Sequence, residues 1–505
     1  MKRILSLLLC LCMLVGLLSG CRGDSAEAYI PTGDALLMED EEENNFVQTD
    51  ETQQLSLVFD PTDSMNPYEC KGYTNRVIFP LIYQSLFAIN QDNEVIHQLC
   101  KSYSVSDDLK TYTFTLDSRA TFSDGTKVTP DDVVTSLWQA WDSNYYGGRF
   151  TYVAGVHAID ENTVSIVLKQ PCDSLPLLLD IPIVKEETLE EAFPIGSGPY
   201  ILGGTEGRRH LSRRSTWWCT SHDLLITAGR IQLLEADNTT QVRDYFEFGD
   251  AGVVCTDPGS EWYVEYRCDY ELWDCETGIF VYLGFNMDSA VFKNLEARQA
   301  VLKGIDRAKL ADNYYRGFAT VAELPASPSS GFYSKTLAQN YSYNEQDFLS
   351  QMAAAGAMGR TVRLLVNADD SLRVKVAQEI GNMLNACGMI VSVEAEDTSD
   401  YRSRLSEGSY DLYLGQTKLS ANMDLSPFFM EKGALSYGGL ANVNQYALCL
   451  QALENEGHYY TLHQTVMENA LICPLLFRSY AVYAARGLLT QLQPARDNLF
   501  CYTIE

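Results

Sequence analysis

The residue types that most often carry chemistry form no catalytic pattern in this chain. Among its six histidines, His458 and His463 lie five residues apart, which places them on different faces of a helix. Two histidines that bind a metal from one helix face are four residues apart, as in H-E-x-x-H, and that motif does not occur. The nucleophile motif G-x-S-x-G is also missing. We therefore predict no enzyme activity, no catalytic residue, no metal site and no cofactor.

The cysteines follow no metal or redox spacing either. Of fourteen cysteines, three lie in the first 21 residues and eleven in the rest, which contains no C-x-x-C pair. Because eleven is odd, at least one thiol stays unpaired. Cys255, Cys268 and Cys275 are near enough in sequence to suggest a local disulfide, although sequence alone does not give connectivity. Buried free thiols are the alternative.

The N-terminus reads as a secretory signal that ends at a cysteine. Lys2 and Arg3 precede an apolar stretch, residues 4–18, whose fifteen residues fall short of the ~20 that a spanning helix needs. The following Leu18-Ser19-Gly20-Cys21 resembles the lipobox of bacterial lipoproteins. That resemblance implies a signal peptide over 1–20, acylation of Cys21 as the first mature residue, and attachment to the membrane through this lipid anchor.

An acidic segment follows Cys21. Residues 22–51 hold ten acidic residues and one basic residue, a composition that favours an extended, disordered tether over 21–54. The whole chain has a net charge of −30, which becomes −32 once the signal is removed. This balance argues against a nucleic-acid partner, since such proteins carry a basic surface. It suits solubility beside an anionic membrane, and it could also attract cationic ligands.

The remaining chain is too long for one core. From residue 55 it has about 450 residues, more than a single hydrophobic core normally serves, so we expect at least two lobes. No other uncharged apolar run approaches ~18 residues, so the sequence predicts no second membrane segment. The body should therefore lie outside the membrane.

Local patterns in the body are those of an α/β protein. Tyr112, Phe114 and Leu116 alternate with threonines, as in a half-buried strand, and an Asp-Gly pair then favours a tight turn. Thr129 and Asp132 predict a capping box. The helix that they start should bury Val133, Val134, Leu137 and Trp138. Further on, residues 362–366, 372–386 and 389–393 read as a βαβ unit with parallel strands.

Five motifs in order carry a family resemblance. Phe122-Ser123-Asp124-Gly125-Thr126 followed by Thr129-Pro130-Asp131-Asp132-Val133 resembles the F-x-D-G-x-x-x-T-A-x-D-V signature of family 5 extracellular solute-binding proteins. These are the oligopeptide, dipeptide and nickel receptors of ABC importers. The other similar segments are Leu81-Ile82-Tyr83-Gln84-Ser85-Leu86, Gly196-Ser197-Gly198-Pro199-Tyr200, Gly284-Phe285-Asn286, and Arg298-Gln299-Ala300 with Ile305-Asp306-Arg307. Individually they read as architectural, and we place Arg298 and Asp306 on one helix as packing and surface contacts, not as a catalytic pair.

The resemblance implies a fold and a function. The fold class is α/β, a two-lobed clamshell like the type II periplasmic binding proteins. Lobe I would cover 55–284 plus 475–505, with an inserted subdomain at about 89–194, and lobe II would cover 285–474. The implied function is a monomeric, lipid-anchored, extracytoplasmic component of an ABC importer, which captures oligopeptides or other small solutes by hinge closure and delivers them to permease subunits. A ligand sensor or surface chaperone of the same fold, or a lipid-anchored hydrolase, is the alternative.

The resemblance also points to ligand-binding residues. In peptide-binding members an aspartate near the Phe428-Phe429 pair holds the ligand's amino terminus, and Asp424 is the nearest candidate here. The sequence departs from the pattern, because the usual position of that acid is Ala421 and a stretch containing Lys418 replaces the usual tryptophan. Asp424 could instead cap a turn. As further contacts we predict the aromatic residues Tyr437, Trp262 and Tyr263; packing in the core is the alternative for these side chains.

Overall fold

A computed structural model describes residues 55–260, 263, 265–489 and 492–504. The predicted signal peptide, Cys21, the whole predicted tether (21–54) and Trp262 lie outside the described residues. Within this part of the chain, no helix has both the length and the apolar character that a membrane crossing requires.

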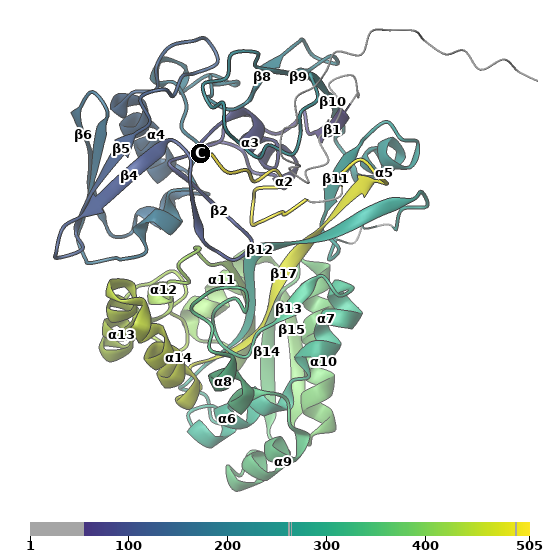
Figure 1. The fold of residues 1–505 in the computed structure, drawn as a ribbon. Helices are drawn as coiled ribbons and strands as arrows, with labels where there is room; N and C mark the ends of the chain where they lie inside the picture. The colour runs from purple at the N-terminus through teal and green to yellow at the C-terminus, as the bar shows by residue number, and fades with distance from the viewer. Residues whose placement is uncertain (1–54, 261–262, 264, 490–491, 505) are drawn as a thin grey trace, which may run out of the picture. The chain divides into compact units, whose positions relative to one another are not determined.

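One large mixed sheet runs through the body (Figure 1). Its eleven strands include a parallel pair at one end, β14 with β15, and an antiparallel pair at the centre, β12 with β17. In spatial order the strands are β15 (Ile390–Glu396), β14 (Thr361–Asn367), β16 (Leu412–Lys418), β12 (Tyr270–Phe285), β17 (Ile472–Ala485), β11 (Val253–Thr256), β1 (Leu55–Phe59), β10 (Arg230–Glu235), β9 (His210–Arg213) and β8 (Tyr200–Gly203), with β13 (Ala319–Val321) pairing with β17.

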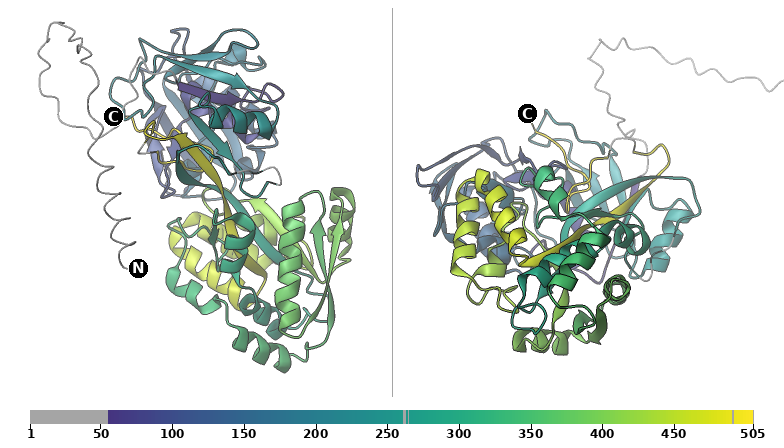
Figure 2. Two further views of the ribbon diagram at one scale, coloured as in Figure 1. Left: turned by 90° about the vertical axis from the view of Figure 1, so that its right-hand side faces the viewer. Right: turned by 90° about the horizontal axis from the view of Figure 1, so that it is seen from below.

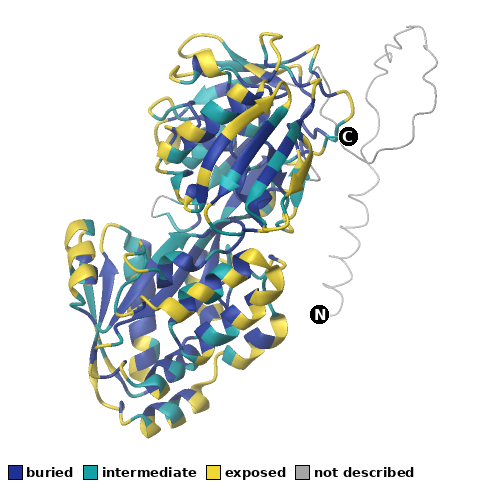
Figure 3. Ribbon diagram, turned by 90° about the vertical axis from the view of Figure 1, so that its left-hand side faces the viewer, coloured by how far each residue is buried: buried dark blue, intermediate teal, exposed yellow. Residues whose placement is uncertain are grey.

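The two longest strands, β12 and β17, serve two hydrophobic cores. They lie side by side along their length (Figure 2). Cys275 and Val482 belong to a first core, whereas Phe280 and Phe477 belong to a second. We call the elements around these cores the first and second lobes; Figure 3 shows buried residues in both. The exact boundaries 55–284 plus 475–505 and 285–474 remain predictions.

A β-bulge marks the passage from one core to the other. The register of β12 on β17 shifts between Glu276 and Ile279. Gly278 takes a φ of +73° there, which only glycine adopts without strain. Thr277 Oγ1 donates 2.8 Å to the Arg478 carbonyl and fixes the irregularity. Bulges bend and twist the strands that carry them, so the connection between the lobes bends at this point.

The first lobe adds two small sheets and short helices to its part of the large sheet. The predicted capping box is confirmed: Thr129 Oγ1 accepts from the Asp132 N–H, and Asp132 accepts from the Thr129 N–H at 2.8 Å. The prediction that Trp138 lies on the buried face of this helix is wrong. Trp138 is 42% exposed, and its ring stacks on that of Trp141 with 5.0 Å between the ring centroids. The elements are β2 (Phe87–Ile89) with β3 (Val95–His97); β4 (Cys100–Val105), β5 (Thr111–Leu116), β7 (Thr163–Leu168) and β6 (Val153–Asp160); α2 (Tyr73–Arg76), α3 (Phe79–Ile82), α4 (Pro130–Asp142) and α5 (Thr239–Glu247); and the 3-10 turns η1 (Gly147–Phe150), η2 (Leu175–Leu178) and η3 (Glu186–Thr188).

The second lobe contains the predicted βαβ unit. Strands β14 and β15 are parallel, and helix α10 (Ser371–Ala386) connects them. Arg298 and Asp306 do not share a helix, which corrects the prediction: α6 ends at Gly304, and Asp306 caps α7 by accepting from the Lys309 N–H. The other helices are α6 (Leu295–Gly304), α7 (Arg307–Tyr315), α8 (Lys335–Ala338), η4 (Gln339–Tyr341), α9 (Glu345–Ala354), α11 (Thr398–Glu407), α12 (Ser426–Phe429), α13 (Val443–Glu454), η5 (Glu456–His458) and α14 (Tyr459–Glu468).

The eleven cysteines of the described chain are all free thiols. Eight are buried, and Cys255, Cys268 and Cys501 are partly exposed. Burial raises the pKa of Cys275 and of Cys501, in each case to about 12, so these thiols stay protonated.

Candidate ligand-binding site

A polar cavity of about 210 Å³ lies beside the bulge where β12 and β17 connect the lobes. Segments far apart in sequence line it, and they come from both lobes. They are the β2–β3 turn (Asn90, Gln91, Asn93), β12 (Asp274, Glu276), β13 (Thr320), the loop residue Ser329, β17 (Ser479) and the C-terminal segment (Pro494, Ala495, Arg496).

Strand geometry explains which side chains face the cavity. Asp274 and Glu276 are two residues apart on β12, so they point to the same face. Ser479 is the register partner of Glu276 on β17 and shares that face. Cys275, between the two acids, points the other way into the first core, where its Sγ lies 3.3 Å from the Tyr73 hydroxyl.

Two serines fix the Glu276 carboxylate. Ser327 Oγ donates to Glu276 Oε2 at 2.8 Å and Ser329 Oγ donates to the same oxygen at 3.0 Å. Burial raises the pKa of Glu276, although these hydrogen bonds and nearby Arg496 oppose the shift. Oε1 has no hydrogen-bond donor among the residues that the structure describes. Asp274 keeps an exposed side chain and lies at the rim.

Arg496 brings the one positive charge among the described residues that line the cavity. Its side chain is 6% exposed, and Nη2 donates 2.8 Å to the Leu419 carbonyl of the second lobe. Neither Arg496 Nη1 nor the buried Ser479 Oγ has a hydrogen-bond partner within the described chain. Both atoms have almost no accessible surface, so they are buried polar groups left without a partner in this conformation.

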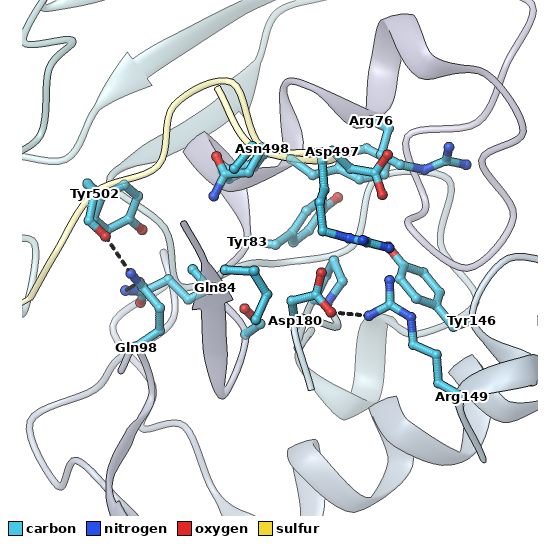
Figure 4. Close-up of a pocket in the computed structure, with 18 residues that line it drawn as sticks. Arg76, Tyr83, Gln84, Gln98, Tyr146, Arg149, Asp180, Asp497, Asn498 and Tyr502 are labelled. Atoms are coloured by element: carbon cyan, nitrogen blue, oxygen red, sulfur yellow. Dashed lines mark hydrogen bonds and ion pairs between the residues drawn. The ribbon is translucent and has the colours of Figure 1, made fainter. Parts of the chain in front are cut away.

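A second, smaller pocket of about 70 Å³ adjoins the cavity and shares Ala495 and Arg496 with it. Figure 4 shows its polar lining, in which Arg149 and Asp180 form an ion pair and Gln98 Nε2 donates 2.8 Å to the Tyr502 carbonyl. The labelled residues are Arg76, Tyr83, Gln84, Gln98, Tyr146, Arg149, Asp180, Asp497, Asn498 and Tyr502.

An ion pair at the edge of this pocket links the lobes. Lys418 Nζ, at the end of β16, lies 2.8 Å from each oxygen of Asp497 on the C-terminal segment, and the Tyr145 hydroxyl bonds to both groups. Burial lowers the pKa of Lys418 to about 8. Burial alone would raise the pKa of Asp497, but Lys418 and Arg76 outweigh it and hold that pKa below its usual range. Asp497 therefore stays ionised between two cations.

The predicted residue Asp424 lies in the second lobe, outside the lining of the cavity. Its oxygens accept from the Ser426 N–H at 2.8 Å and from Ser426 Oγ at 2.7 Å, the pattern of an Asx turn just before the short helix α12, whose N-cap is Leu425. Burial raises its pKa. A role for Asp424 in ligand binding stays a prediction.

The predicted aromatic residues are placed in different parts of the molecule. Tyr437 lies in the second lobe, with its ring edge-on to Tyr413 at 6.1 Å between centroids. Tyr263 lies in the first lobe, where it lines a separate cavity of about 210 Å³ and its hydroxyl bonds to that of Tyr483. Neither lines the cavity at the crossing. The chain's own sequence held a signal for the residues that do: Asp-x-Glu at 274–276 is a same-face acid pair inside an otherwise largely apolar strand.

Two α/β lobes joined by two long strands, with a polar cavity at the crossing, define the architecture of two-lobed solute-binding proteins. Residues 94–434 match the family model described as "Bacterial extracellular solute-binding proteins, family 5 Middle". The chain belongs to this family, which confirms the resemblance found in the sequence. It is a substrate-binding protein of the class that serves ABC importers, and its family places it among binding proteins rather than enzymes.

Known proteins support the assignment. The glutathione-binding protein GsiB of Escherichia coli K12 is 26% identical over 395 residues, which cover 72% of this chain and 75% of that protein. The solved structure of the ABC transporter substrate-binding protein CtaP from Listeria monocytogenes gives a TM-score of 0.72 at 18% identity and covers 89% of this chain and 99% of that one. The structure of HbpA2 from Haemophilus parasuis gives a TM-score of 0.74 at 18% identity and covers 90% of this chain and 100% of that one. The predicted α/β fold class is confirmed by these structures.

Proposed function

We propose that this chain captures short peptides or peptide-like solutes at the crossing of β12 and β17 and delivers them to ABC permease subunits. The observation that carries the proposal is the composition of the cavity, which draws polar side chains from both lobes and from both connecting strands. Support also comes from GsiB, named for glutathione binding. The oligopeptide-binding protein AppA of Bacillus subtilis, solved with a nonapeptide, shares the fold with a TM-score of 0.62 at 18% identity.

Hinge closure provides the mechanism. Outside the cavity, the described contacts between the lobes include the ion pair of Lys418 with Asp497. They also include hydrogen bonds from the Asp173 N–H to the Leu453 carbonyl at 2.8 Å and from Arg316 Nε to the Pro258 carbonyl at 3.3 Å. A solute that contacts both lobes stabilises the closed state by the contacts that exist only there. The closed, loaded protein therefore presents a different surface to the permease than the open, empty protein does.

Export and anchoring complete the proposal. The chain acts outside the cytoplasm as a monomer, held to the membrane by lipid on Cys21 after removal of residues 1–20. Mass spectrometry of the N-terminal peptide from the purified membrane fraction should find diacylglyceryl on Cys21, and Cys21→Ser should release the protein from membranes. An unmodified Cys21 in membrane-bound material would refute the anchor and leave the binding function standing.

Calorimetry tests the binding function. Peptides of two to nine residues should bind with micromolar or tighter dissociation constants, about −8 kcal/mol, and mass spectrometry of the purified protein should detect retained peptide. Asp424→Asn tests the predicted contact in the same assay: weaker binding of peptides with a free amino terminus would support it, and unchanged affinity would remove it. If no peptide of the library binds, the peptide proposal is refuted.

A further inference from the structure

We infer that residues 418–422 form a clasp that helps to close the two lobes and then retains the solute, through contacts between the chain's own residues. The clasp begins at the last residue of β16 in the second lobe, and the side chains of Leu419 and Met423 anchor it in the second core. From there it reaches the first lobe by an ion pair, two hydrogen bonds and an apolar contact. The inference rests on the proposed function only for the retention of the solute; closure of the lobes does not depend on it.

The ion pair lies at the first residue of the clasp. Lys418 Nζ is 2.8 Å from both oxygens of Asp497, and the Tyr145 hydroxyl of the first lobe bonds to both side chains. Asp497 is tied to the first lobe, because Leu499 and Phe500 beside it lie in the first core. The side chains of Lys418 and Asp497 are 28% and 15% exposed, so water screens their attraction less than it would on an open surface. Charges from the two lobes therefore attract each other across the closed contact.

Two hydrogen bonds join the following residues of the clasp to the first lobe. Arg496 Nη2 donates 2.8 Å to the Leu419 carbonyl, and Asn422 Nδ2 donates to Ser174 Oγ at 3.3 Å. Arg496 and Ser174 are both buried, so their positions in the first lobe are fixed by the residues packed around them. Each bond contributes little net free energy, but together they fix the position of the segment on the first lobe.

An apolar contact lies between these hydrogen bonds. Ala421 packs with Ile89 of β2 and Leu177 of η2, and all three side chains are buried. This small cluster is distinct from the cores of the two lobes and draws residues from both. Opening would expose the three side chains to water, so their burial favours the closed state.

Removal of one charge should open the clasp. In the closed state, Asp497→Asn would leave the Lys418 ammonium facing Arg76 and Arg496, whereas in the open state the same ammonium reaches water. Removal of one partner of a buried ion pair is strongly destabilising, but replacement of both partners by uncharged residues is often neutral. The double variant Asp497→Asn, Lys418→Met should therefore close again. A substitution that merely damages the fold would not be rescued in this way.

The test measures the distance between the lobes by single-molecule fluorescence energy transfer. It uses the full-length chain in detergent at pH 7.5, after bound solute has been removed by dialysis and with no peptide added. The dyes are attached to p-acetylphenylalanine, which replaces Ile159 on β6 of the first lobe and Val443 on α13 of the second, so the cysteines stay unlabelled. Both positions are exposed, at 60% and 83%, so the dyes do not disturb a core.

We expect Asp497→Asn to raise the ratio of open to closed molecules at least tenfold. The double variant with Lys418→Met should return this ratio to within threefold of the wild-type value. The matched control Lys309→Gln breaks a lysine–carboxylate pair with Glu379 inside the second lobe and should leave the ratio unchanged.

An unchanged ratio in Asp497→Asn would overturn the clasp, and so would a double variant that stays as open as Asp497→Asn. If the circular dichroism spectrum shows that Asp497→Asn does not fold, Ala421→Asp tests the same segment through its apolar contact. A carboxylate at that position should also raise the ratio at least tenfold, and an unchanged ratio would again overturn the clasp.

A dissociation assay separates the clasp from the proposed function. A fluorescent peptide bound to the wild type should leave Asp497→Asn at least tenfold faster, because release requires the lobes to open. An unchanged dissociation rate together with a raised ratio would overturn the retention of the solute by the clasp. If no peptide binds to any of the proteins, the proposed function fails, and the distance measurement alone decides the clasp.

Discussion

The ion pair between Lys418 and Asp497 should be among the strongest single polar links between the two lobes. Their side chains are 28% and 15% exposed, and their charged atoms lie 2.8 Å apart. Asp497→Asn would leave Lys418 and Arg76 as neighbouring cations with little solvent. Removing one partner of a buried pair typically costs 3–5 kcal/mol, and allowing for the partial exposure we expect a loss of about 3 kcal/mol in the free energy of unfolding. Lys418→Met should cost less, about 2 kcal/mol, because Arg76 still faces Asp497.

A double-mutant cycle measures the link directly. Urea unfolding followed by circular dichroism at pH 7.5 would be compared for the wild type, Asp497→Asn, Lys418→Met and the double variant. The double variant should lose about 2 kcal/mol less than the sum of the single losses. Losses that add within about 0.5 kcal/mol would refute the reasoning, because additivity means that the two charges do not interact.

An exposed pair gives the control, and acid gives a second readout. Arg119 bonds to Asp117 at 2.8 Å but is 51% exposed, so Arg119→Met should cost less than about 1 kcal/mol. Because the pKa of Asp497 is lowered in the folded state, its contribution is present above the unfolded pKa of about 3.9 and is lost as pH falls further. The stability gap between wild type and Asp497→Asn should stay constant from pH 7 to 5 and close below pH 4.

Three further predictions concern stability and thiol chemistry. Burial lowers the pKa of His463 to about 3, so below pH 6.5 the unfolded chain binds a proton that the folded chain does not. Between pH 6.5 and 5 the free energy of unfolding of the wild type should therefore fall by about 2 kcal/mol relative to that of His463→Leu. Parallel pH profiles of the two proteins in urea unfolding would contradict this. Gly284→Ala would place a Cβ 2.0 Å from the buried ring of Tyr413, so we expect the free energy of unfolding to fall by about 2 kcal/mol. Scanning fluorimetry should then show a lower melting temperature. An unchanged melting temperature would show that the ring can move aside. In the Cys21→Ser variant, freed of the N-terminal signal, an aromatic disulfide reagent should label at most three thiols in the native state and eleven in guanidinium chloride. Nine labelled thiols under denaturing conditions would indicate one disulfide.

Local features of the fold were predictable from the sequence. The capping box at Thr129 and the parallel βαβ unit depend on residues within one short segment, so propensity and periodicity suffice. Trp138 was misplaced because the apolar periodicity counts a tryptophan as core, whereas this ring finds its partner on the helix itself, in Trp141. The break between Arg298 and Asp306 was missed because Asp306 is itself the cap of a new helix.

The candidate site was less predictable, because its residues come from distant segments. Glu276 and Arg496 are separated by more than two hundred positions, and no periodicity relates them. Lys418 appeared in the sequence only as a departure from the family pattern. In the structure it has a partner of its own, Asp497. The resemblance to the family placed a binding residue at Asp424; its carboxylate bonds Ser426 in the structure, and its role in binding stays a prediction.

The position of the acid pair determines how binding and closure can be coupled. To move a two-state equilibrium from 1:99 to 99:1, a ligand must favour one state by about 5.5 kcal/mol. A hydrogen bond to a charged group contributes about 1.5–3 kcal/mol, so one such bond to Glu276 cannot close the protein alone. The ligand must also use groups held by the other lobe, such as Ser329, or groups such as Arg496 that are tied to it through the Leu419 carbonyl. Solutes too short to span these groups should therefore bind without closing the lobes, and transport should begin only at the length at which both ends of the cavity are engaged.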